Sequence, residues 1–442
     1  MTNYYKYLPM KSIRRSKLAL KKRQTRQYLF ALLLLLALIF MCLYEFYFTI
    51  MERAKNGEAE ANILERIVCQ VFMLSVCPNK EDGSSTQLRN KIEQLNKEQK
   101  IRNFSDQELK EQSTVVVIQV HRQIEYLKEL ISSLSDVPDA DSMFLIFSHD
   151  YYSEDINQLV HSIDFAPVLQ VFFPFSSQLY PNEFPGNSPD DCPWNLEVAE
   201  ARSRECEGAQ TPDQNGHFRQ AEVSQSKHHW WWMYNMVFEK VHILKQYNGP
   251  VLFLEEGQFV APDTVHMLRL MTELAAVQCP ECNSFHLHNP HGSQLYKVET
   301  NKVEIAPWDG VGFAFGRGLW QALRACANVF CTLDDANWSA SFLYAAQECF
   351  FQRLTTLVIR VSRVLELCES KSGACDLQMA VHEAKTQLSS VKPYMFPENV
   401  MLESTNYHQP HVRRGWGGWS DSRDIQLCLN LTVWPTSTVL AK

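Results

Sequence analysis

Runs of β-branched and apolar residues alternate with amphipathic stretches through most of the chain, and this alternation limits the fold more than any other feature. The clearest runs are Val115–Val120, Phe144–Ser148, Val168–Phe173 and Val251–Leu254. Strands that alternate with helices form βα units, whose strands pair in parallel and whose helices cover the sheet. The sequence therefore predicts an α/β domain over residues 113–442, with a mostly parallel sheet flanked by helices around one large core or two abutting halves.

Two glutamates and a glycine follow the last run. Glu255 and Glu256 stand at the end of the predicted strand, and Gly257 comes where a third carboxylate could stand. Ligands of open α/β sheets bind in the crevice outside the carboxyl ends of the strands, where carboxylates can hold a metal ion or a sugar nucleotide. The alternative is a solvated turn after a core strand.

A tryptophan-rich segment between the third and fourth runs predicts a helix. Its apolar stripe has spacings of four, three, four and three, at Trp230, Tyr234, Val237, Val241 and Leu244. Ser224 or Ser226 is expected to cap this helix. The first turn would then carry basic side chains beside backbone N–H groups that are free to meet an anion. Those side chains are Lys227, His228 and His229.

Three consecutive tryptophans, 230–232, cannot all lie on one face of a helix. We therefore expect at least one of them to line a pocket or to pack on a second element. The alternative is a thick core helix under a loop.

The amino-terminal residues have the pattern of a membrane anchor. Residues 1–26 carry nine Lys or Arg and no acid, and residues 27–44 are eighteen uncharged, mostly apolar residues. This is just under the roughly 20 residues that span a bilayer core, and the apolar residues up to 51 extend it. Because no small-residue cleavage site is evident, we expect an uncleaved signal anchor at 27–51, with the tail 1–26 in the cytosol. The chain would be a type II membrane protein with a polar lumenal stem at 52–112.

Charge and cysteines limit the partners and the compartment. Beyond residue 26 the chain has 33 basic and 50 acidic residues, a formal charge of −17, which excludes nucleic acid as an expected partner. Ten cysteines from Cys192 to Cys428 predict five disulfides in an oxidising lumen. Cys279 and Cys282 also have the local spacing of a zinc site, although no second Cys-x-x-Cys follows. Cys69 and Cys77 could close a small loop or join two stems covalently.

Several segments closely resemble one enzyme family. They are "IFSHDYYSEDINQLV", "PVLQVFFPFSSQLYPNEFPG", "SQSKHHWWW", "LFLEE", "FCTLDDANW", "YMFPENV" and "GWGGW". Over about residues 112–428 the chain is similar to the N-acetylglucosaminyltransferase II family. The resemblance implies a Golgi membrane enzyme with a GT-A type glycosyltransferase fold behind a single transmembrane helix. Such enzymes use Mn²⁺ and transfer GlcNAc from UDP-GlcNAc, with inversion, in β-1,2 linkage to the α-1,6-arm mannose of N-glycans on glycoproteins. A homodimer or a partner glycosyltransferase is compatible with this interpretation.

The resemblance also pairs the ten lumenal cysteines. It implies the disulfides Cys192–Cys206, Cys279–Cys282, Cys326–Cys349, Cys331–Cys428 and Cys368–Cys375. The Cys-Pro-Glu-Cys segment then becomes a small disulfide loop rather than a zinc site.

Site residues follow from the resemblance position by position. The nucleotide-sugar side is implied at Gln119, Val120, His121, Asp150, Gln225, Lys227, His228 and His229. The third carboxylate of the family, which binds Mn²⁺, falls on Gly257, and a second metal ligand, a histidine, falls on Glu366. Glu256 and Glu366 are the remaining candidates for a weakened metal site, because glutamate can bind Mn²⁺.

Other positions depart from the family pattern at the chemistry. The catalytic aspartate that follows a tryptophan in the family is replaced by Ser339, whose hydroxyl cannot act as a base near neutral pH without help. Asp335 is then the remaining candidate base. Gln294 replaces a nucleotide-contacting arginine, and residues 310–312 and 121–123 replace Asn-Met-Gly and His-Asn-Arg.

Two functions therefore remain open. The chain is either an active β-1,2-N-acetylglucosaminyltransferase with a rebuilt site, or a catalytically impaired or inactive relative that binds UDP, a glycan or a partner transferase. Removal of a catalytic acid–base group typically costs about 10²–10⁴-fold in rate, which is the reason for the second interpretation.

Three sequons mark potential N-glycans. Asn103 and Asn430 are expected to be glycosylated on the lumenal side, whereas Asn337 is less expected because tryptophan stands in its middle position.

Overall fold

A nine-stranded sheet organises the residues that the computed structural model describes. Those residues are 83–104, 109, 112–138, 140–290, 299–368, 375–403, 411–412 and 414–433. The predicted anchor at 27–51, Cys69, Cys77 and Gln294 lie outside them. Within the described ranges no helix is both long and apolar enough to cross a membrane.

Four parallel strands form one side of the sheet. In spatial order they are β3 (Val168–Phe172), β2 (Met143–His149), β1 (Thr114–Val120) and β4 (Val251–Glu255). Each predicted run becomes one of these strands, so this part of the prediction is confirmed. Their side chains are buried on both faces, which is why they read as continuous apolar runs.

Five shorter strands complete the sheet beyond β4. They are β8 (Phe313–Phe315), β6 (Ser284–His286), β9 (Thr356–Ile359), β7 (Lys302–Ile305) and β11 (Met401–Glu403). Antiparallel pairing occurs where β8 meets β4 and β6 and where β7 meets β9, and the other pairs are parallel. The sheet is therefore mostly parallel, as predicted. Strands of three or four residues give too short a pattern to be found from the sequence.

Helices cover both faces of the sheet. One face carries α4 (Ile124–Ser135), α5 (Glu154–His161) and α8 (Thr264–Gln278). The other carries α7 (Ala221–Asn235), α10 (Arg317–Ala325), α11 (Ala327–Thr332), α12 (Trp338–Glu348) and α14 (Ser422–Val433). Side chains of a strand alternate between faces, so Val115 and Val117 join the core of the α7 face while Val116 and Ile118 join the other.

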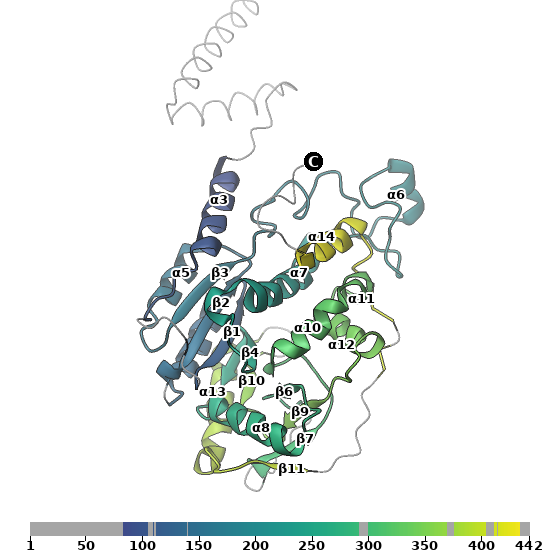
Figure 1. Ribbon diagram of the computed structural model, residues 1–442. Coiled ribbons are helices and arrows are strands. Elements are labelled where there is room, and N and C mark those ends of the chain that lie inside the picture. The colour runs from purple at the N-terminus through teal and green to yellow at the C-terminus, as the bar shows by residue number, and fades with distance from the viewer. Residues whose placement is uncertain are drawn as a thin grey trace, which may run out of the picture. The chain divides into compact units, whose positions relative to one another are not determined.

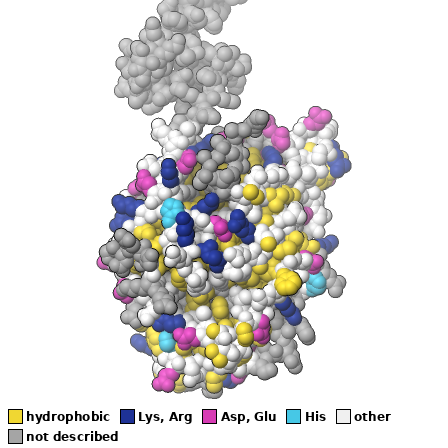
Figure 2. Space-filling view, viewed as in Figure 1, with side chains coloured by type: hydrophobic (Ala, Val, Ile, Leu, Met, Phe, Trp, Pro, Cys, Tyr) yellow, Lys and Arg dark blue, Asp and Glu magenta, His cyan; other side chains and the backbone are white. Residues whose placement is uncertain are grey.

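Smaller elements surround this framework (Figure 1). They are α3 (Gly83–Glu98), α6 (Val198–Arg204), α13 (Leu377–Val391), and a two-stranded sheet of β5 (Gln258–Val260) and β10 (Val364–Glu366). Short helical turns lie at Ala140–Ser142, Met236–Lys240, His242–Leu244 and Lys392–Tyr394. On the face shown in Figure 2, basic and acidic side chains are interspersed with apolar ones.

Helix α7 begins earlier than predicted. It starts at Ala221 after Gln220, so Ser224 and Ser226 lie inside the helix and do not cap it. The basic side chains at 227–229 therefore lie beyond the first turn, where backbone N–H groups are already used by the helix. The predicted start was wrong because serine is a common N-cap residue, whereas the helix here begins after Gln220.

All three tryptophans of α7 are buried, but against different elements. Trp230 stacks on Trp338 at 4.0 Å between ring centroids, and Trp231 stacks on Phe330 at 4.4 Å. Trp232 meets Phe173 edge to face at 5.8 Å. The prediction that at least one tryptophan packs on a second element is confirmed. Helix α7 lies between the sheet and α14, and α14 runs alongside it although it is distant in sequence (Figure 1).

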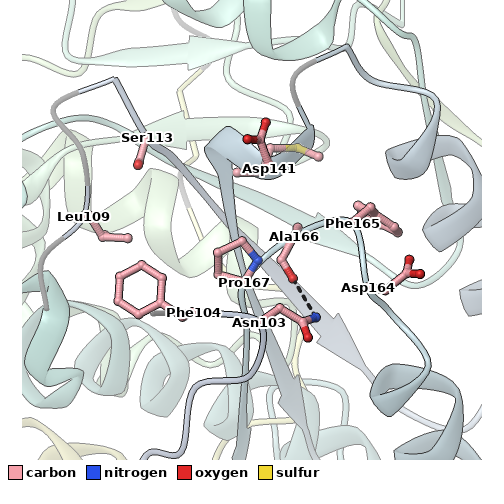
Figure 3. A pocket seen from close by; sticks show the side chains of 10 residues that line it. Asn103, Phe104, Leu109, Ser113, Asp141, Asp164, Phe165, Ala166 and Pro167 are labelled. Carbon is pink, nitrogen blue, oxygen red and sulfur yellow. Dashed lines mark hydrogen bonds between the residues drawn. The ribbon is translucent and has the colours of Figure 1, made fainter. Parts of the chain in front are cut away.

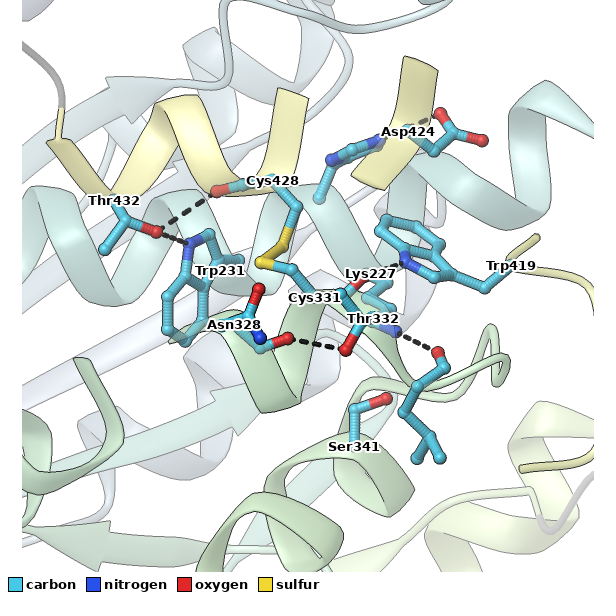
Figure 4. The surroundings of a disulfide bond; sticks show 12 residues. Lys227, Trp231, Asn328, Cys331, Thr332, Ser341, Trp419, Asp424, Cys428 and Thr432 are labelled. Atoms are coloured by element: carbon cyan, nitrogen blue, oxygen red, sulfur yellow. Dashed lines mark hydrogen bonds and ion pairs between the residues drawn. A yellow bond between two sulfur atoms is a disulfide. The ribbon is translucent and has the colours of Figure 1, made fainter. Parts of the chain in front are cut away.

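The structure contains the five disulfides that the resemblance implies. They are Cys192–Cys206, Cys279–Cys282, Cys326–Cys349, Cys331–Cys428 and Cys368–Cys375. The Cys331–Cys428 bond ties α11 to α14 across a sequence separation of 97 residues (Figure 4). A crosslink over so long a segment removes much of the freedom of the unfolded chain.

Part of the predicted stem packs on the domain. In α3, Ile92 is buried beside Leu88 and Leu95, and these side chains contact the β3 edge through Phe172. Asn96 fixes that edge, since its side chain both donates to and accepts from the backbone of Phe172. The compact unit thus includes residues 83–104, because α3 has an apolar stripe with a surface to cover.

Candidate functional site

A hollow of about 350 Å³ lies where β1, β2 and β4 end. Parallel strands bring their carboxyl ends to one edge of a sheet, so the residues that follow them come together. The hollow, called here the strand-end pocket, has polar and acidic walls. Its lining residues are Gln119, His121, Gln123, Asp150, Glu222, Ser226, Glu255, Glu256, Gly257, Gln258, Glu366 and Cys368. The sequence pattern located this edge correctly.

Asp150 is the best-supported acid of the strand-end pocket. His121 Nδ1 lies 2.6 Å from Asp150 Oδ1, and Gln225 Nε2 donates to Asp150 Oδ2 at 3.0 Å. Burial by itself would raise the pKa of Asp150, but the hydrogen bonds from His121 and His229 outweigh it and hold that pKa below its usual range. The hydrogen bond to Asp150 in turn raises the pKa of His121. Asp150 is therefore a fixed anion that can accept an N–H from a ligand.

Val120 and His229, also predicted for the nucleotide-sugar side, are buried next to Asp150 and support it. The carbonyl of Val120 accepts the backbone N–H of Asp150 at 3.1 Å, and the Val120 side chain is buried. His229 is also buried, with Nδ1 3.2 Å from Gln119 Nε2 and Nε2 2.8 Å from Ser148 Oγ. Both residues position the wall of the pocket rather than lining it.

Lys227 and His228 lie in the interior, away from the strand-end pocket. The Nζ of Lys227 donates to the carbonyls of Leu333 and Asp335 at 3.2 and 2.9 Å, and it lies 4.1 Å from the Trp419 ring centre (Figure 4). His228 Nε2 lies 3.0 Å from Asp424 Oδ1. Because α7 starts at Ala221, these side chains point toward α11 and α14 and hold the fold together.

Helix α7 offers the pocket two side chains that the sequence analysis did not assign to it, although Ser226 was expected there as a helix cap. Glu222 and Ser226 stand four residues apart, on one face of the helix, and both line the strand-end pocket. Their spacing of four residues fits one helix face, but the sequence analysis started the helix too late to include Glu222.

Glu256 is held by the backbone. Its Oε2 accepts the N–H of His121 at 2.9 Å, and its Oε1 accepts the N–H groups of Arg122 and Gln123 at 3.2 and 3.1 Å. Burial raises its pKa, against the effect of these hydrogen bonds. A carboxylate that accepts three backbone N–H groups anchors the start of α4 and has few lone pairs left for a metal ion. This argues against Glu256 as a main metal ligand.

Glu255 is the acid of the pocket with the freest carboxyl group. Within the described residues its side-chain oxygens accept no hydrogen bond, whereas its backbone N–H donates to Gln258 at 3.2 Å. Burial, together with repulsion from Glu366 and Glu256, raises the pKa of Glu255 to about 7. Burial therefore moves the titration of Glu255 toward neutral pH.

Glu366 lines the same pocket. It lies on β10 opposite Gln258 in register, next to the backbone hydrogen bond from Leu367 N–H to the Gly257 carbonyl at 2.9 Å. A Cβ built on Gly257 would meet its nearest neighbour, Tyr126 Cδ1, at 4.0 Å, so a side chain fits there. Among the described residues no three His, Cys, Asp or Glu side chains form a ready metal-binding group. Glu255 and Glu366 are the hard oxygen donors that a divalent cation would find.

We expect Glu255 to make stability depend on pH. Its carboxyl pKa is raised from 4.5 to about 7 in the fold, so between these values the native protein binds a proton that the unfolded chain has lost. Stability from this group is thus fully present below pH 4.5 and is lost as the pH rises from 4.5 to about 7. In EDTA, Glu255→Gln should melt with the unmodified chain at about pH 4 but several degrees above it at pH 8.

The difference between the two melting curves isolates Glu255 from other titrating groups. Its ceiling is about 3 kcal/mol, the free-energy equivalent of the pKa shift. Equal gaps between the curves at both pH values would contradict the raised pKa. Glu366→Gln is the matched control, and it should reduce the pH dependence only in part, since burial is the largest cause of the shift.

Asp335, the candidate base, is committed to a loop. Its Oδ1 accepts the N–H of Asn337 at 2.8 Å and its Oδ2 accepts the N–H of Trp416 at 3.1 Å. Its side chain is buried, which raises its pKa despite these bonds. It is not among the residues that line the strand-end pocket. Asp334 is bound in the same way by Gln214 and Trp419 N–H groups, both at 3.0 Å. These aspartates brace the segment 414–419.

That segment presents one large aromatic side chain to solvent. Trp416 is 84% exposed, whereas Trp419 is buried with its Nε1 donating to the Cys331 carbonyl at 2.8 Å. Gly417 and Gly418 have positive φ values of 97° and 82°, which fixes a turn that other residues rarely adopt. A second hollow, of about 290 Å³, lies beside Gly415 and is lined in part by Asp334, Tyr344 and Arg414.

Ser339 stands at the second position of α12. Its Oγ donates to Asn337 Oδ1 at 2.9 Å, and a Cβ built on Gly310 would lie 3.1 Å from the Ser339 Cβ. Gly310 and Gly312 both have positive φ, so the segment 310–312 is a tight turn beside the start of α12. No carboxylate takes the place of the Ser339 hydroxyl on this turn of α12.

Comparison with known proteins identifies the family of the chain. The family model for N-acetylglucosaminyltransferase II (MGAT2) matches residues 89–428. The chain belongs to this family. Among relatives, alpha-1,6-mannosyl-glycoprotein 2-beta-N-acetylglucosaminyltransferase of Sus scrofa is 38% identical over 365 residues, covering 80% of this chain and 82% of that protein. The Homo sapiens protein of the same name is 38% identical, covering 78% and 80%. The Arabidopsis thaliana protein is 30% identical, covering 74% and 76%.

The likeness to solved structures is looser. A mannosyltransferase from Pyrobaculum calidifontis in complex with GDP-Man and Mn²⁺ has a TM-score of 0.28 at 10% identity, covering 71% of this chain and 80% of that one. The family assignment rests on sequence. The structure brings Gln119, His121 and Asp150 together in one pocket, and Gly257 and Ser339 stand where the resemblance implies carboxylates.

Proposed function

We propose that this member of the N-acetylglucosaminyltransferase II family transfers GlcNAc from UDP-GlcNAc, in β-1,2 linkage with inversion, to the α-1,6-arm mannose of N-glycans. The observation that carries the proposal is the strand-end pocket, where Gln119, His121 and Asp150 converge at the edge expected for the nucleotide of a GT-A fold. Family membership over residues 89–428 supports the donor and the acceptor class.

The residues of the pocket suit the first part of this reaction, the binding of the donor. The Asp150 anion can accept the imide N–H of uracil, while Gln119 and His121 position the base and the ribose. The pocket is acidic and the diphosphate is anionic, so a divalent cation would have to balance the charge. Mn²⁺, when bound, would stabilise the leaving diphosphate.

Acceptor activation is the weak part of the reaction. An inverting transfer needs a base that takes the proton from the attacking hydroxyl, and the position at the start of α12 holds Ser339. Loss of such a base costs about 10²–10⁴-fold, so we expect slow turnover. On the acceptor side, the Trp416 indole offers a flat apolar face to a sugar ring.

Direct measurement of transfer tests the proposal. The full-length chain, purified in detergent, is incubated with UDP-GlcNAc, Mn²⁺ and an N-glycan whose α-1,6-arm mannose is unsubstituted, and the product is followed by mass spectrometry. Growth of a product one GlcNAc heavier, linked to O2 of that mannose, supports the proposal. No product, in a chain that still binds UDP, favours the second candidate, a non-catalytic binding protein, for which the loss of carboxylates at Gly257 and Ser339 is the specific observation.

We expect metal to strengthen nucleotide binding only weakly. Glu256 is engaged by three backbone N–H groups and Gly257 has no side chain, so few carboxylates remain to hold Mn²⁺ against the diphosphate. In calorimetric titrations of UDP, Mn²⁺ should change affinity less than tenfold in the unmodified chain and more than tenfold in Gly257→Asp. A strong Mn²⁺ requirement in the unmodified chain would overturn this view of Gly257.

We further propose that the chain is a type II protein of the Golgi membrane. The support is the basic tail 1–26, the apolar segment 27–51 and the family's substrates. Protease added to intact Golgi vesicles should shorten the chain only by its tail, and detergent should expose the rest. Digestion of the main domain without detergent would refute this topology.

A further inference from the structure

The three sequons of the chain differ in how the fold uses the nitrogen that would carry a glycan. That nitrogen is Nδ2 of the asparagine, and attachment replaces one of its two hydrogens with a sugar. A folded site accepts a glycan without loss when Nδ2 is exposed and is not needed as a donor. Asn103, Asn337 and Asn430 can be compared on this basis.

Asn103 is exposed, but its side-chain nitrogen serves as a donor to the fold. Nδ2 donates to the carbonyl of Ile163 at 2.6 Å. It also donates to the carbonyl of Ala166 at 3.1 Å, the bond drawn in Figure 3. Asn103 also has a positive φ of 54°, which the contacts of its side chain help to hold. A glycan would remove one of the two donors and leave a carbonyl of the segment 163–166 without its partner. The folded domain thus disfavours a glycan here.

Asn430 is half-buried in the interior of α14. Its Oδ1 accepts a hydrogen bond from Gln426 Nε2 at 2.9 Å. The hydroxyl of its sequon partner Thr432 donates to the Cys428 carbonyl at 3.2 Å and accepts from Trp231 at 3.0 Å. Among the described residues Asn430 Nδ2 also donates no hydrogen bond, so this sequon differs from Asn337 by its half-burial in a packed helix next to a disulfide (Figure 4).

Asn337 has the opposite arrangement. It is exposed, and it is the N-cap of α12: its Oδ1 accepts the N–H groups of Ser339 and Ala340 at 2.8 and 3.5 Å, as well as the Ser339 hydroxyl. Among the described residues its Nδ2 donates no hydrogen bond. Because glycosylation changes Nδ2 and leaves Oδ1 as an amide oxygen, a glycosylated Asn337 can keep its cap. The fold uses Asn337 Oδ1 as the helix cap and leaves Nδ2 available for a glycan.

We propose that Asn337 is the sequon at which this fold accepts an N-glycan, and that the glycan stands over the start of α12. This inference rests on the proposed lumenal topology. In the attachment step, Nδ2 forms a bond to C1 of the sugar of a lipid-linked oligosaccharide diphosphate. The bond from C1 to the diphosphate oxygen breaks, the lipid diphosphate leaves, and Nδ2 loses one proton. The completed glycan then lies near Ser339 and Gly310.

Site-by-site glycopeptide analysis tests the inference. The full-length chain is made in secretory cells, and peptide-N-glycosidase in ¹⁸O-water marks each occupied asparagine for mass spectrometry. We expect Asn337 to be occupied in more than half of the folded molecules. Asn337→Asp should remove one glycan while keeping the melting temperature, since aspartate is also a good N-cap. Ser339→Thr should retain that glycan, and Ser339→Ala should lose it.

The outcomes separate the inference from the function. An unmodified Asn337 in a chain that carries a glycan at Asn103 or Asn430 overturns the inference and leaves the topology intact. A chain with no glycan at any sequon overturns both the topology and the inference. An occupied Asn337 in a chain that transfers no GlcNAc supports the inference and counts against catalysis only.

Discussion

Replacing Gly257 and Ser339 together by aspartate should raise GlcNAc transfer by about 10²-fold or more over the unmodified chain. The change at 257 adds a carboxylate to the strand-end pocket, where it can hold a cation against the departing diphosphate. The change at 339 supplies a base for the attacking hydroxyl, and such a group contributes about 10²–10⁴-fold. One carboxylate acts on the leaving diphosphate and the other on the attacking hydroxyl of the same displacement. We therefore expect the double variant to gain more activity than either single variant.

Both positions have room for the new side chain. The nearest atom to a Cβ at Gly257 is Tyr126 Cδ1 at 4.0 Å, and Gly257 has no positive φ. Ser339 lies in the first turn of α12, where the helix dipole favours a negative charge. We therefore expect the double variant to stay folded, which a melting curve would verify before activity is compared.

Single variants separate the causes of any gain. Ser339→Asp also removes the sequon of Asn337, so Asn337→Asp is the matched control for loss of the glycan alone. We expect that control, and Asn337→Gln, to leave transfer at the level of the unmodified chain. Two results would refute this account of the missing carboxylates: a folded double variant that remains at background, or an unmodified chain that already turns over at the rate of an ordinary transferase.

Replacing Asp424 by alanine should cost about 3–5 kcal/mol of stability, the usual penalty for removing one partner of a buried ion pair. Asp424 Oδ2 accepts from Arg219 Nε at 2.8 Å and from Ser224 Oγ at 2.9 Å. Its Oδ1 lies 3.0 Å from His228 Nε2. Burial opposes its charge, yet the His228 hydrogen bond and the Arg219 charge hold the pKa of Asp424 below its usual range.

The size of the loss follows from what remains after the substitution. The Arg219 side chain is only 4% exposed and would lose its shorter ion pair, keeping only Asp191 Oδ2 at 3.7 Å from its Nη1. His228 and Ser224, both buried, would also lose a partner. The contacts join α7 to α14 (Figure 4), and the Cys331–Cys428 disulfide cannot replace them because it ties α14 to α11.

Denaturant unfolding of the full-length chain measures this loss. The matched control is Glu200→Ala on α6, which removes a carboxylate from an exposed ion pair with Arg204, and exposed pairs are worth about 1 kcal/mol or less. Asp424→Asn should fall between the two variants, because the amide oxygen can still accept from Arg219. A loss for Asp424→Ala as small as that of the control would mean that this network does not hold α7 to α14.

The sequence by itself determined the elements whose pattern is local. The four long strands were legible because each is a continuous apolar run, and their parallel pairing placed Glu255 and Asp150 at one edge without reference to any contact. The disulfide pairing and the family followed from resemblance across many positions. The substitutions at Gly257 and Ser339 were also legible in the sequence, because they are changes of residue type.

Tertiary structure decided which of those residues face the pocket. Glu256 and Glu255 are neighbours in sequence, but three backbone N–H groups from the start of α4 bind one, while burial and two other carboxylates raise the pKa of the other. Lys227 turned into the core because α7 begins at Ala221, and Glu222 reached the pocket for the same reason. The sequence could not show this, since the hydrogen bonds and the electrostatic field around a side chain come from segments more than a hundred residues away.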